Sequence, residues 1–183
     1  MNFEPDYLIF ENLKMFKNTF LKFRTGKAVK LNKSAHYSTS FVEVNQVGIL
    51  FTSGDESKLN AIKQLTSQLE SDRKEVQILE YAPSKNDQSK SDFPKYSIKS
   101  YNFWGNLENS DAQNFINQTF DYLFVIDQEI ILPIQNILAQ SKAKCRVGRS
   151  VPGMEAYFDL MIEMTGDHTA LIQGMINYTK KLS

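Results

Sequence analysis

Phe120-Asp-Tyr-Leu-Phe-Val-Ile-Asp127 is an apolar stretch of strand length, and it decides the fold class. A helix-length segment with Pro133 near its start follows, and a second short strand, Ala143-Lys-Cys-Arg-Val-Gly148, comes next. Proline favours the first turn of a helix, because its missing N–H is not needed there. The order strand, helix, strand predicts a β-α-β unit whose two strands are parallel.

A second unit of the same kind begins at Val47-Gly-Ile-Leu-Phe51 and ends with a strand at residues 76–81. Between these strands, four apolar residues at helical spacing mark the inner face of a helix: Leu59, Ile62, Leu65 and Leu69. The spacing of Ser53 and Glu56 predicts a capping box at the start of this helix.

A further strand is expected at residues 157–162, and residues 96–104 are expected to form a strand or an extended segment. Further helices are expected at residues 110–118 and after Asp167. Strands that alternate with helices through short joins imply right-handed crossovers and a sheet covered on both faces. We therefore expect residues 44–183 to form a single three-layer α/β domain, Rossmann-like or flavodoxin-like, with a mostly parallel sheet.

Residues 1–43 are expected to form a basic amphipathic helix and arm that precede the domain. Apolar side chains fall on one broad face of residues 8–24, which predicts a helix there. Thr25 and Gly26 are expected to end this helix, and residues 27–40 are expected to be a connecting arm.

Basic residues gather in this leading segment, although the whole chain has no net charge. Residues 14–40 contain no acidic residue. The side chains expected to bind an anionic partner, either RNA in a ribonucleoprotein or a membrane surface, are Lys14, Lys17, Lys22, Arg24, Lys27, Lys30 and Lys33. The alternative is that the helix packs on the domain by its aromatic face and that these charges are only solvated.

The sequence argues against a membrane-spanning protein and against an exported protein. No stretch approaches the roughly 18 apolar residues that a membrane-spanning helix needs, and the acidic N-terminus is unlike an export signal. Cys145 is the only cysteine, which excludes an internal disulfide and suits a reducing compartment. We therefore expect a cytoplasmic protein in which Cys145 is a buried, unreactive thiol.

Ligands of open α/β sheets bind beyond the carboxyl ends of the strands. Ser53 and Asp55 follow the first strand in a loop that lacks the glycine and lysine patterns of phosphate-binding turns. Asp55 would repel a phosphate and suits the N-terminus of the following helix. Asp127 ends a later strand, and with Asp55 and Glu129 it could hold Mg²⁺, although helix capping by Asp127 explains the same residues.

Arg146 and Arg149 lie near the end of another strand. Two arginines can clamp a phosphate or a carboxylate, and the alternative is a solvated rim. Together with the residues above they complete the predicted small-molecule pocket: Ser53, Asp55, Asp127, Arg146 and Arg149.

No catalytic set can be assembled from the sequence. His36 and His168 are the only histidines, and neither has the spacing of a triad or a metal site. Four aromatic residues could stack on a base or pack in the core: Tyr96, Tyr101, Phe103 and Trp104. We therefore expect no metal and no cofactor.

Three functional hypotheses follow from the residues. The leading one is a non-enzymatic binding or accessory protein that uses its basic N-terminal segment on RNA, a ribonucleoprotein or a membrane surface. The alternative is a nucleotide or nucleotide-sugar binding domain with a pocket at the strand ends. The third is a scaffold that binds a protein partner. The sequence gives neither the strand order nor the oligomeric state.

Two resemblances bear on these hypotheses. The stretch from Phe120 to Gly148 resembles a strand, helix and Ala-Lys-x-Arg-x-Gly passage in the N-terminal half of heptosyltransferase-type glycosyltransferases. The nucleotide-sugar-binding second half of those enzymes has no counterpart here, so the resemblance implies at most a degenerate half.

The chain after about residue 10 also resembles an uncharacterised Bacteroidota domain-of-unknown-function family of short proteins. The residues that carry this resemblance are Val47–Phe51, Phe103-Trp-Gly105, Phe120–Leu123, Ala143–Gly148 and Tyr157–Ile162. The resemblance implies a cytoplasmic Rossmann-like domain, and it supplies no reaction and no functional residue.

Overall fold

The computed structural model describes the backbone of residues 5–32, 40–83 and 91–182, and the side chains of these residues from Met15 onward. Within these ranges, six strands form one sheet in the order β3-β2-β1-β4-β5-β6. All five strand pairings are parallel. The strands are β1 (Gln46–Thr52), β2 (Glu75–Tyr81), β3 (Lys95–Tyr96), β4 (Tyr122–Val125), β5 (Cys145–Arg149) and β6 (Leu160–Ile162).

The strand order confirms the expected α/β fold with a mostly parallel sheet. The chain starts in the middle of the sheet with β1, moves outward to β3, and returns to the other side of β1 with β4. This is the strand order of Rossmann-like doubly wound folds. Its direction reverses between β1 and β4, which makes the carboxyl ends of these two strands the first place to look for a site.

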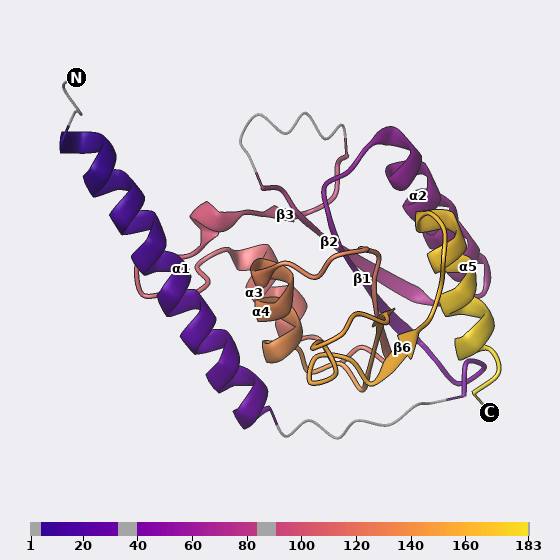
Figure 1. Ribbon diagram of the computed structural model, residues 1–183. Coiled ribbons are helices and arrows are strands. Elements are labelled where there is room, and N and C mark those ends of the chain that lie inside the picture. Colours follow the sequence, from indigo (N-terminus) through magenta and orange to yellow (C-terminus); the bar gives the residue numbers. More distant parts are fainter. Residues whose placement is uncertain (1–4, 33–39, 84–90, 183) are drawn as a thin grey trace.

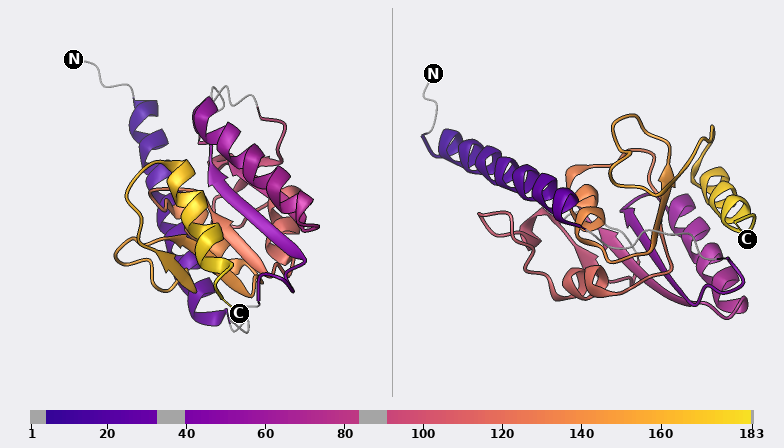
Figure 2. Two further views of the ribbon diagram at one scale, coloured as in Figure 1. Left: turned by 90° about the vertical axis from the view of Figure 1, so that its right-hand side faces the viewer. Right: turned by 90° about the horizontal axis from the view of Figure 1, so that it is seen from below.

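Helices cover both faces of the sheet. Figure 1 shows α2 (Glu56–Ser71) and α5 (His168–Thr179) on one side, and α3 (Ser110–Asn117) and α4 (Leu132–Gln140) on the other. The long helix α1 (Pro5–Leu31) lies against α4, outside the sheet, and its first turns extend beyond the body (Figure 2). None of the described helices combines the length and the apolar character needed to cross a membrane.

The two faces of β1 enter two separate cores. Val47, Ile49 and Phe51 pack with α2 and α5, whereas Leu50 packs with α3 and α4. Successive side chains of a strand point to opposite faces, so the continuous apolar run predicted a strand buried on both sides. The structure confirms this prediction.

The expected end of the first helix at Thr25 and Gly26 is wrong, because α1 continues to Leu31. Glycine costs only about 1 kcal/mol in a helix interior. Packing on α4 offsets this cost: Leu21 and Thr25 are buried on the side of α1 that faces the body. Residues 27–31 are therefore helix rather than arm, and residues 33–39 of the expected arm lie outside the described residues.

The expectation of a strand or an extended segment at residues 96–104 is also wrong beyond Tyr96, where β3 ends. A short 3₁₀ helix, η1 (Ile98–Ser100), follows β3, and a tight turn comes next. The side chain of Asn102 accepts hydrogen bonds from the backbone N–H groups of Trp104 and Asn106. Asparagine side chains stabilise turns in this way, and this local bonding outweighs the β preference of the aromatic residues.

Candidate functional site

A cavity of about 450 Å³ lies at the carboxyl ends of β1 and β4, where the strand order reverses. Its lining includes Ser53, Gly54, Asp55, Asp127, Glu129 and His168. The structure therefore brings together three of the five residues predicted for a small-molecule pocket. The other two, Arg146 and Arg149, do not line this cavity.

The lining of the cavity includes a buried ion pair between Lys58 of α2 and Asp127 after β4. Lys58 Nζ lies 2.5 Å from Asp127 Oδ1, and the two side chains are only 6% and 4% exposed. Lys58 also donates to the carbonyl oxygen of Thr52 at 2.8 Å, and Asp127 accepts from the backbone N–H of Thr52. Asp127 thus binds a lysine rather than capping a helix, which corrects that part of the sequence interpretation.

The loop after β1 is shaped by this lysine. A Cβ atom on Gly54 would lie 2.6 Å from the Cδ atom of Lys58, so only glycine leaves room for the lysine chain. Asp55 is the N-cap of α2 and accepts from the backbone N–H of Lys58 at 2.9 Å. An ammonium group and a carboxylate thus lie where a phosphate-binding turn would leave space for an anion.

The predicted capping box between Ser53 and Glu56 is wrong. The Ser53 hydroxyl donates instead to Glu80, a fully buried carboxylate of β2 that also accepts from the Ser91 hydroxyl. The N-cap is Asp55, two residues later than the capping box requires. Ser53 is therefore committed to an internal hydrogen bond.

The electrostatics of this cavity do not favour an anion. Burial raises the pKa of the Asp127 carboxyl, and the Lys58 ammonium only partly offsets this effect. Burial and the nearby Lys58 lower the pKa of His168, another lining residue, which favours its neutral imidazole. In the described ranges, no group of three or more His, Cys, Asp or Glu side chains is arranged to hold a metal ion.

Arg146 has a structural role elsewhere. It is buried within β5, and its Nε atom donates to Asp159 Oδ2 at 3.0 Å while a second nitrogen donates to Oδ1 at 3.2 Å. Arg149 ends β5 and is half-buried. Cys145 is buried as expected, and burial is the main cause that raises the pKa of its thiol to about 12.

The position of Lys58 could not be found from the sequence. Its partner Asp127 is 69 residues away, and a lysine near the start of a helix is normally solvated. The only local signal is Gly54, whose lack of a side chain allows the lysine to pass.

A second candidate site is on α1, which the structure fixes to the body. Asn136 of α4 donates to the hydroxyl of Thr25 at 2.9 Å. Asn32 donates to the carbonyl oxygens of Ala139 and Ser141 at the end of α4, at 3.1 and 2.9 Å. The carbonyl groups at the end of a helix have no partners within that helix. Asn32, the residue that follows α1, therefore caps the end of α4.

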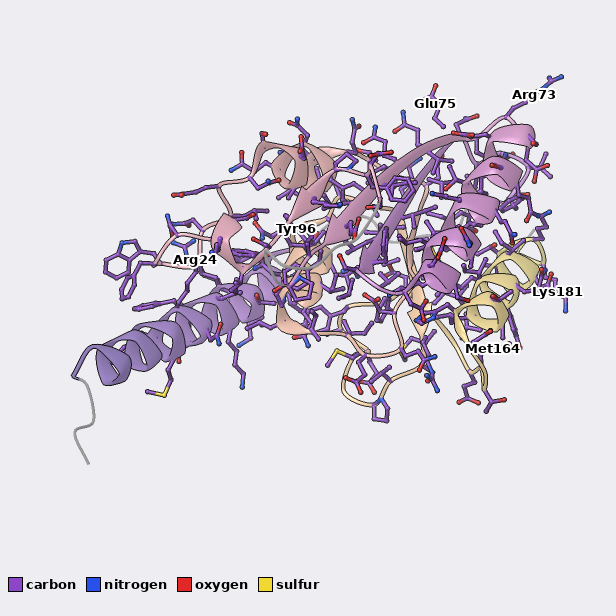
Figure 3. The ribbon with its side chains drawn as sticks, turned by 90° about the horizontal axis from the view of Figure 1, so that it is seen from above. Arg24, Arg73, Glu75, Tyr96, Met164 and Lys181 are labelled. Atoms are coloured by element: carbon purple, nitrogen blue, oxygen red, sulfur yellow. The ribbon has the colours of Figure 1, made fainter. Side chains whose placement is uncertain are left out.

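The turn at residues 102–106 packs against the exposed side of α1. Lys17 donates to the carbonyl oxygen of Tyr101, and Arg24 donates through Nε to that of Trp104 at 2.7 Å. Figure 3 shows Arg24 on α1 beside this turn. Gly105 has a φ of +73°, and a Cβ atom there would lie 2.9 Å from the backbone nitrogen of Leu21, so a glycine is required.

This contact leaves a row of aromatic rings on the surface. The ring of Phe20 on α1 contacts two rings of the turn. Its centroid lies 5.7 Å from that of Phe103 and 5.3 Å from that of Trp104. The exposed fractions are 52% for Phe16, 70% for Phe23, 41% for Phe103 and 57% for Trp104. We call these five residues the aromatic surface. The aromatic patch expected from the sequence is thus split, because Tyr96 and Tyr101 are buried in the core.

The basic residues predicted to bind a partner fall into three groups. Lys17 and Arg24 each make a hydrogen bond to the turn. Lys22, Lys27 and Lys30 are exposed. The side chains of Lys14 and Lys33 lie outside the described residues, as does His36. Residues three or four apart share a helix face, so Lys27 continues the row of Phe16, Phe20 and Phe23, whereas Lys22 points to the opposite side.

The model of one protein family, described as a family of unknown function (DUF6913), matches residues 17–182. No curated protein matches the chain. The family match runs from the middle of α1 to the end of the described chain, so it includes the cavity at the strand ends and every residue of the aromatic surface except Phe16.

Proposed function

We propose that this chain, which belongs to that family of unknown function, is a non-enzymatic accessory protein that binds an anionic membrane surface through α1 and the aromatic surface. One observation carries the proposal. Four aromatic side chains of the aromatic surface are exposed, and the part of α1 beside them contains lysines and, from residue 14 onward, no acidic residue. Exposed apolar groups of this kind mark interaction sites in soluble domains.

The free energy of membrane binding can come from both kinds of side chain. Burying one large apolar side chain contributes about 1.5–3 kcal/mol, and each lysine near an anionic leaflet contributes about 1 kcal/mol. The helix is held on the body by Thr25, Asn32 and Asn136. A surface that is already ordered loses little conformational entropy when it binds.

The geometry of the rings favours lipid over RNA. Phe103 and Trp104 stand edge to face, with 84° between their planes. Successive bases of single-stranded RNA stack on ring faces, and these two faces are not parallel. Insertion among lipid headgroups has no such requirement, since it depends on apolar area and adjacent positive charge. The proposal takes the protein to be cytoplasmic, where the facing leaflet is anionic.

Vesicle co-sedimentation tests the proposal. The protein should sediment with phosphatidylcholine vesicles that contain about 30% phosphatidylserine and remain in solution with phosphatidylcholine alone. The double variant Phe23→Ser and Trp104→Ser should bind at least tenfold more weakly. A matched control is Tyr178→Ser on α5, which removes another half-exposed aromatic ring from a different surface and should leave binding unchanged.

Two results would contradict this proposal. One is equal loss of binding in the Tyr178→Ser variant, which would show that the aromatic surface has no special role. The other is binding to single-stranded RNA without binding to vesicles, which would show that the partner is RNA and not a membrane surface.

A second candidate function is the binding of a nucleotide or nucleotide-sugar at the strand ends, as in a degenerate glycosyltransferase-like half. The cavity at the reversal of strand order supports it, whereas the acidic lining and the absence of Arg146 and Arg149 from that lining weigh against it. Thermal unfolding with nucleotides and sugar nucleotides tests this candidate, because a ligand at 100 times its Kd adds about 2.7 kcal/mol of stability. The absence of any shift would remove it.

A further inference from the structure

The outer edge of the sheet next to β2 is only partly covered. β3 contains two residues, and it pairs with Glu80 and Tyr81 at the end of β2. The first five residues of β2, Glu75–Leu79, pair with β1 alone. In the part of the chain that the structure describes, no strand lies on their other side.

The direction of each backbone group on β2 follows from the bonds that are present. Glu75 donates to the carbonyl oxygen of Asn45 before β1. Glu80 donates to the other side, to the carbonyl oxygen of Pro94. Backbone groups alternate between the two neighbours along a strand, so the N–H and C=O groups of Val76 and Ile78 point to the uncovered side. An exposed row of such groups is a template for another strand.

A groove runs along this edge. It has a volume of about 480 Å³, lies between α2 and α3, and has apolar walls from Val76, Ile78, Phe93 and Phe115. Figure 3 shows Glu75, at the start of β2, pointing away from the body at this end of the sheet. The outward backbone groups of Val76 and Ile78 therefore border a groove with apolar walls, and both residues are partly exposed.

The charges in the groove have one sign. Glu70 of α2 and Asp111 of α3 are its only charged lining residues within the described ranges, and both are exposed. α2 and α3 cover opposite faces of the sheet. A strand added to β2 would direct successive side chains toward these two faces in turn, so it would meet a carboxylate on each face.

We propose that the open edge of β2 binds an extended, basic segment of a partner protein, which adds a parallel or antiparallel strand beside Val76–Ile78. The outward backbone groups select the extended conformation, the groove accepts apolar side chains, and Glu70 and Asp111 select lysine or arginine. This mode of recognition takes its affinity from main-chain bonds and its specificity from alternating side chains. It is independent of the aromatic surface on α1.

A fluorescein-labelled peptide of alternating lysine and valine, eight residues long, tests the proposal by fluorescence anisotropy. It should bind the full-length protein saturably. The same peptide with N-methyl groups on alternate residues keeps its charge but cannot pair with the edge, and it should bind at least tenfold more weakly. A peptide of alternating glutamate and valine should not bind.

A pair of variants identifies the edge. Val76→Pro removes the outward N–H, which has no partner in the sheet, so the ladder with β1 is kept. It should reduce peptide binding at least tenfold, whereas Val76→Ala keeps the N–H and should change binding less than threefold. Circular dichroism shows whether Val76→Pro folds, and if it does not, the N-methyl comparison still decides.

The proposal is overturned by the absence of saturable binding, by equal binding of the N-methylated peptide, or by unchanged binding in a folded Val76→Pro variant. It is also overturned if sedimentation shows that the protein dimerises and that Val76→Pro makes it monomeric. In that case the occupant of the edge is a second copy of this chain.

Discussion

At the scale of single residues, the ion pair between Lys58 and Asp127 dominates the reversal point of the sheet. Both charges are buried, and Thr52 supplies them with further hydrogen bonds. A buried pair of this kind adds little net stability over apolar residues, but removal of one partner leaves an uncompensated charge. The side chains of Lys58 and Asp127 therefore occupy space at the strand ends, where ligands of open α/β sheets bind.

Replacing Lys58 by methionine should therefore lower the free energy of unfolding by about 3–5 kcal/mol. The matched control is Lys63→Met, on the exposed side of the same helix, which should change it by less than about 0.5 kcal/mol. Urea unfolding at pH 7 measures both values. Equal stability of the two variants would show that the buried pair is not needed.

Asp121 links the starts of three strands. Its carboxylate accepts from the backbone N–H groups of Asn45 and Gln46 at 2.8 and 3.0 Å and from Lys144 at 2.6 Å. Partial burial alone would raise the pKa of Asp121, but the hydrogen bonds from Gln46, Lys144 and Asn45 outweigh it and lower the pKa. Charged Asp121 therefore stabilises the folded state.

The pH dependence of this contribution has a definite sign. Because the pKa of Asp121 is lower in the folded state, its contribution is fully present above the unfolded value of about 4 and is lost as the pH falls through the folded value. Asp121→Asn should cost about 1–3 kcal/mol at pH 7, and the difference from the unsubstituted protein should shrink below about pH 4. Urea unfolding between pH 3 and 7 checks this, and a constant difference would contradict it.

At the scale of elements, prediction from the sequence succeeds where burial alone decides. β1 and β4 are short apolar runs buried on both faces. These two strands, and also β2 and β5, lie within about two residues of their predicted bounds. It fails where a distant contact or local bonding decides. α1 passes Gly26 because α4 supports it, and the expected third strand gives way to the turn that Asn102 organises.

The same limit applies to the candidate sites. Ser53, Asp55 and Asp127 share a cavity because strand ends converge, which the strand pattern predicts. Arg146 pairs with Asp159 and does not line the cavity, whereas Lys58 pairs with Asp127 and does line it. Both pairings join distant parts of the fold, so no local pattern in the sequence reveals them.

The contact between α1 and the turn at residues 102–106 depends on Gly105. Its φ is +73° and a Cβ atom would clash with the backbone of Leu21, so Gly105→Ala should destabilise the protein by about 1–3 kcal/mol. Gly153→Ala is the matched control, because its φ is +83° but nothing lies within 4 Å of the added atom. The control should cost less, since it adds backbone strain without a clash. Urea unfolding compares the two, and a larger loss in Gly153→Ala would contradict this account of the contact.

At the scale of the whole molecule, charge and apolar surface are distributed unevenly. The chain has no net charge, but its first 40 residues are basic and the remainder is acidic. The body therefore repels an anionic surface weakly, while α1 attracts it. This distribution should orient the protein with α1 toward the membrane, and raising the salt concentration should weaken vesicle binding because it screens the attraction.

The central claim is that the aromatic surface enters an anionic lipid surface, and Trp104, the only tryptophan of the chain, reports on this event. Titration with phosphatidylserine-containing vesicles should shift its fluorescence emission to shorter wavelength, and phosphatidylcholine vesicles should not. The shift should disappear when Phe16 and Phe23 are both replaced by serine. An emission spectrum that stays unchanged at saturating anionic vesicles would contradict the account.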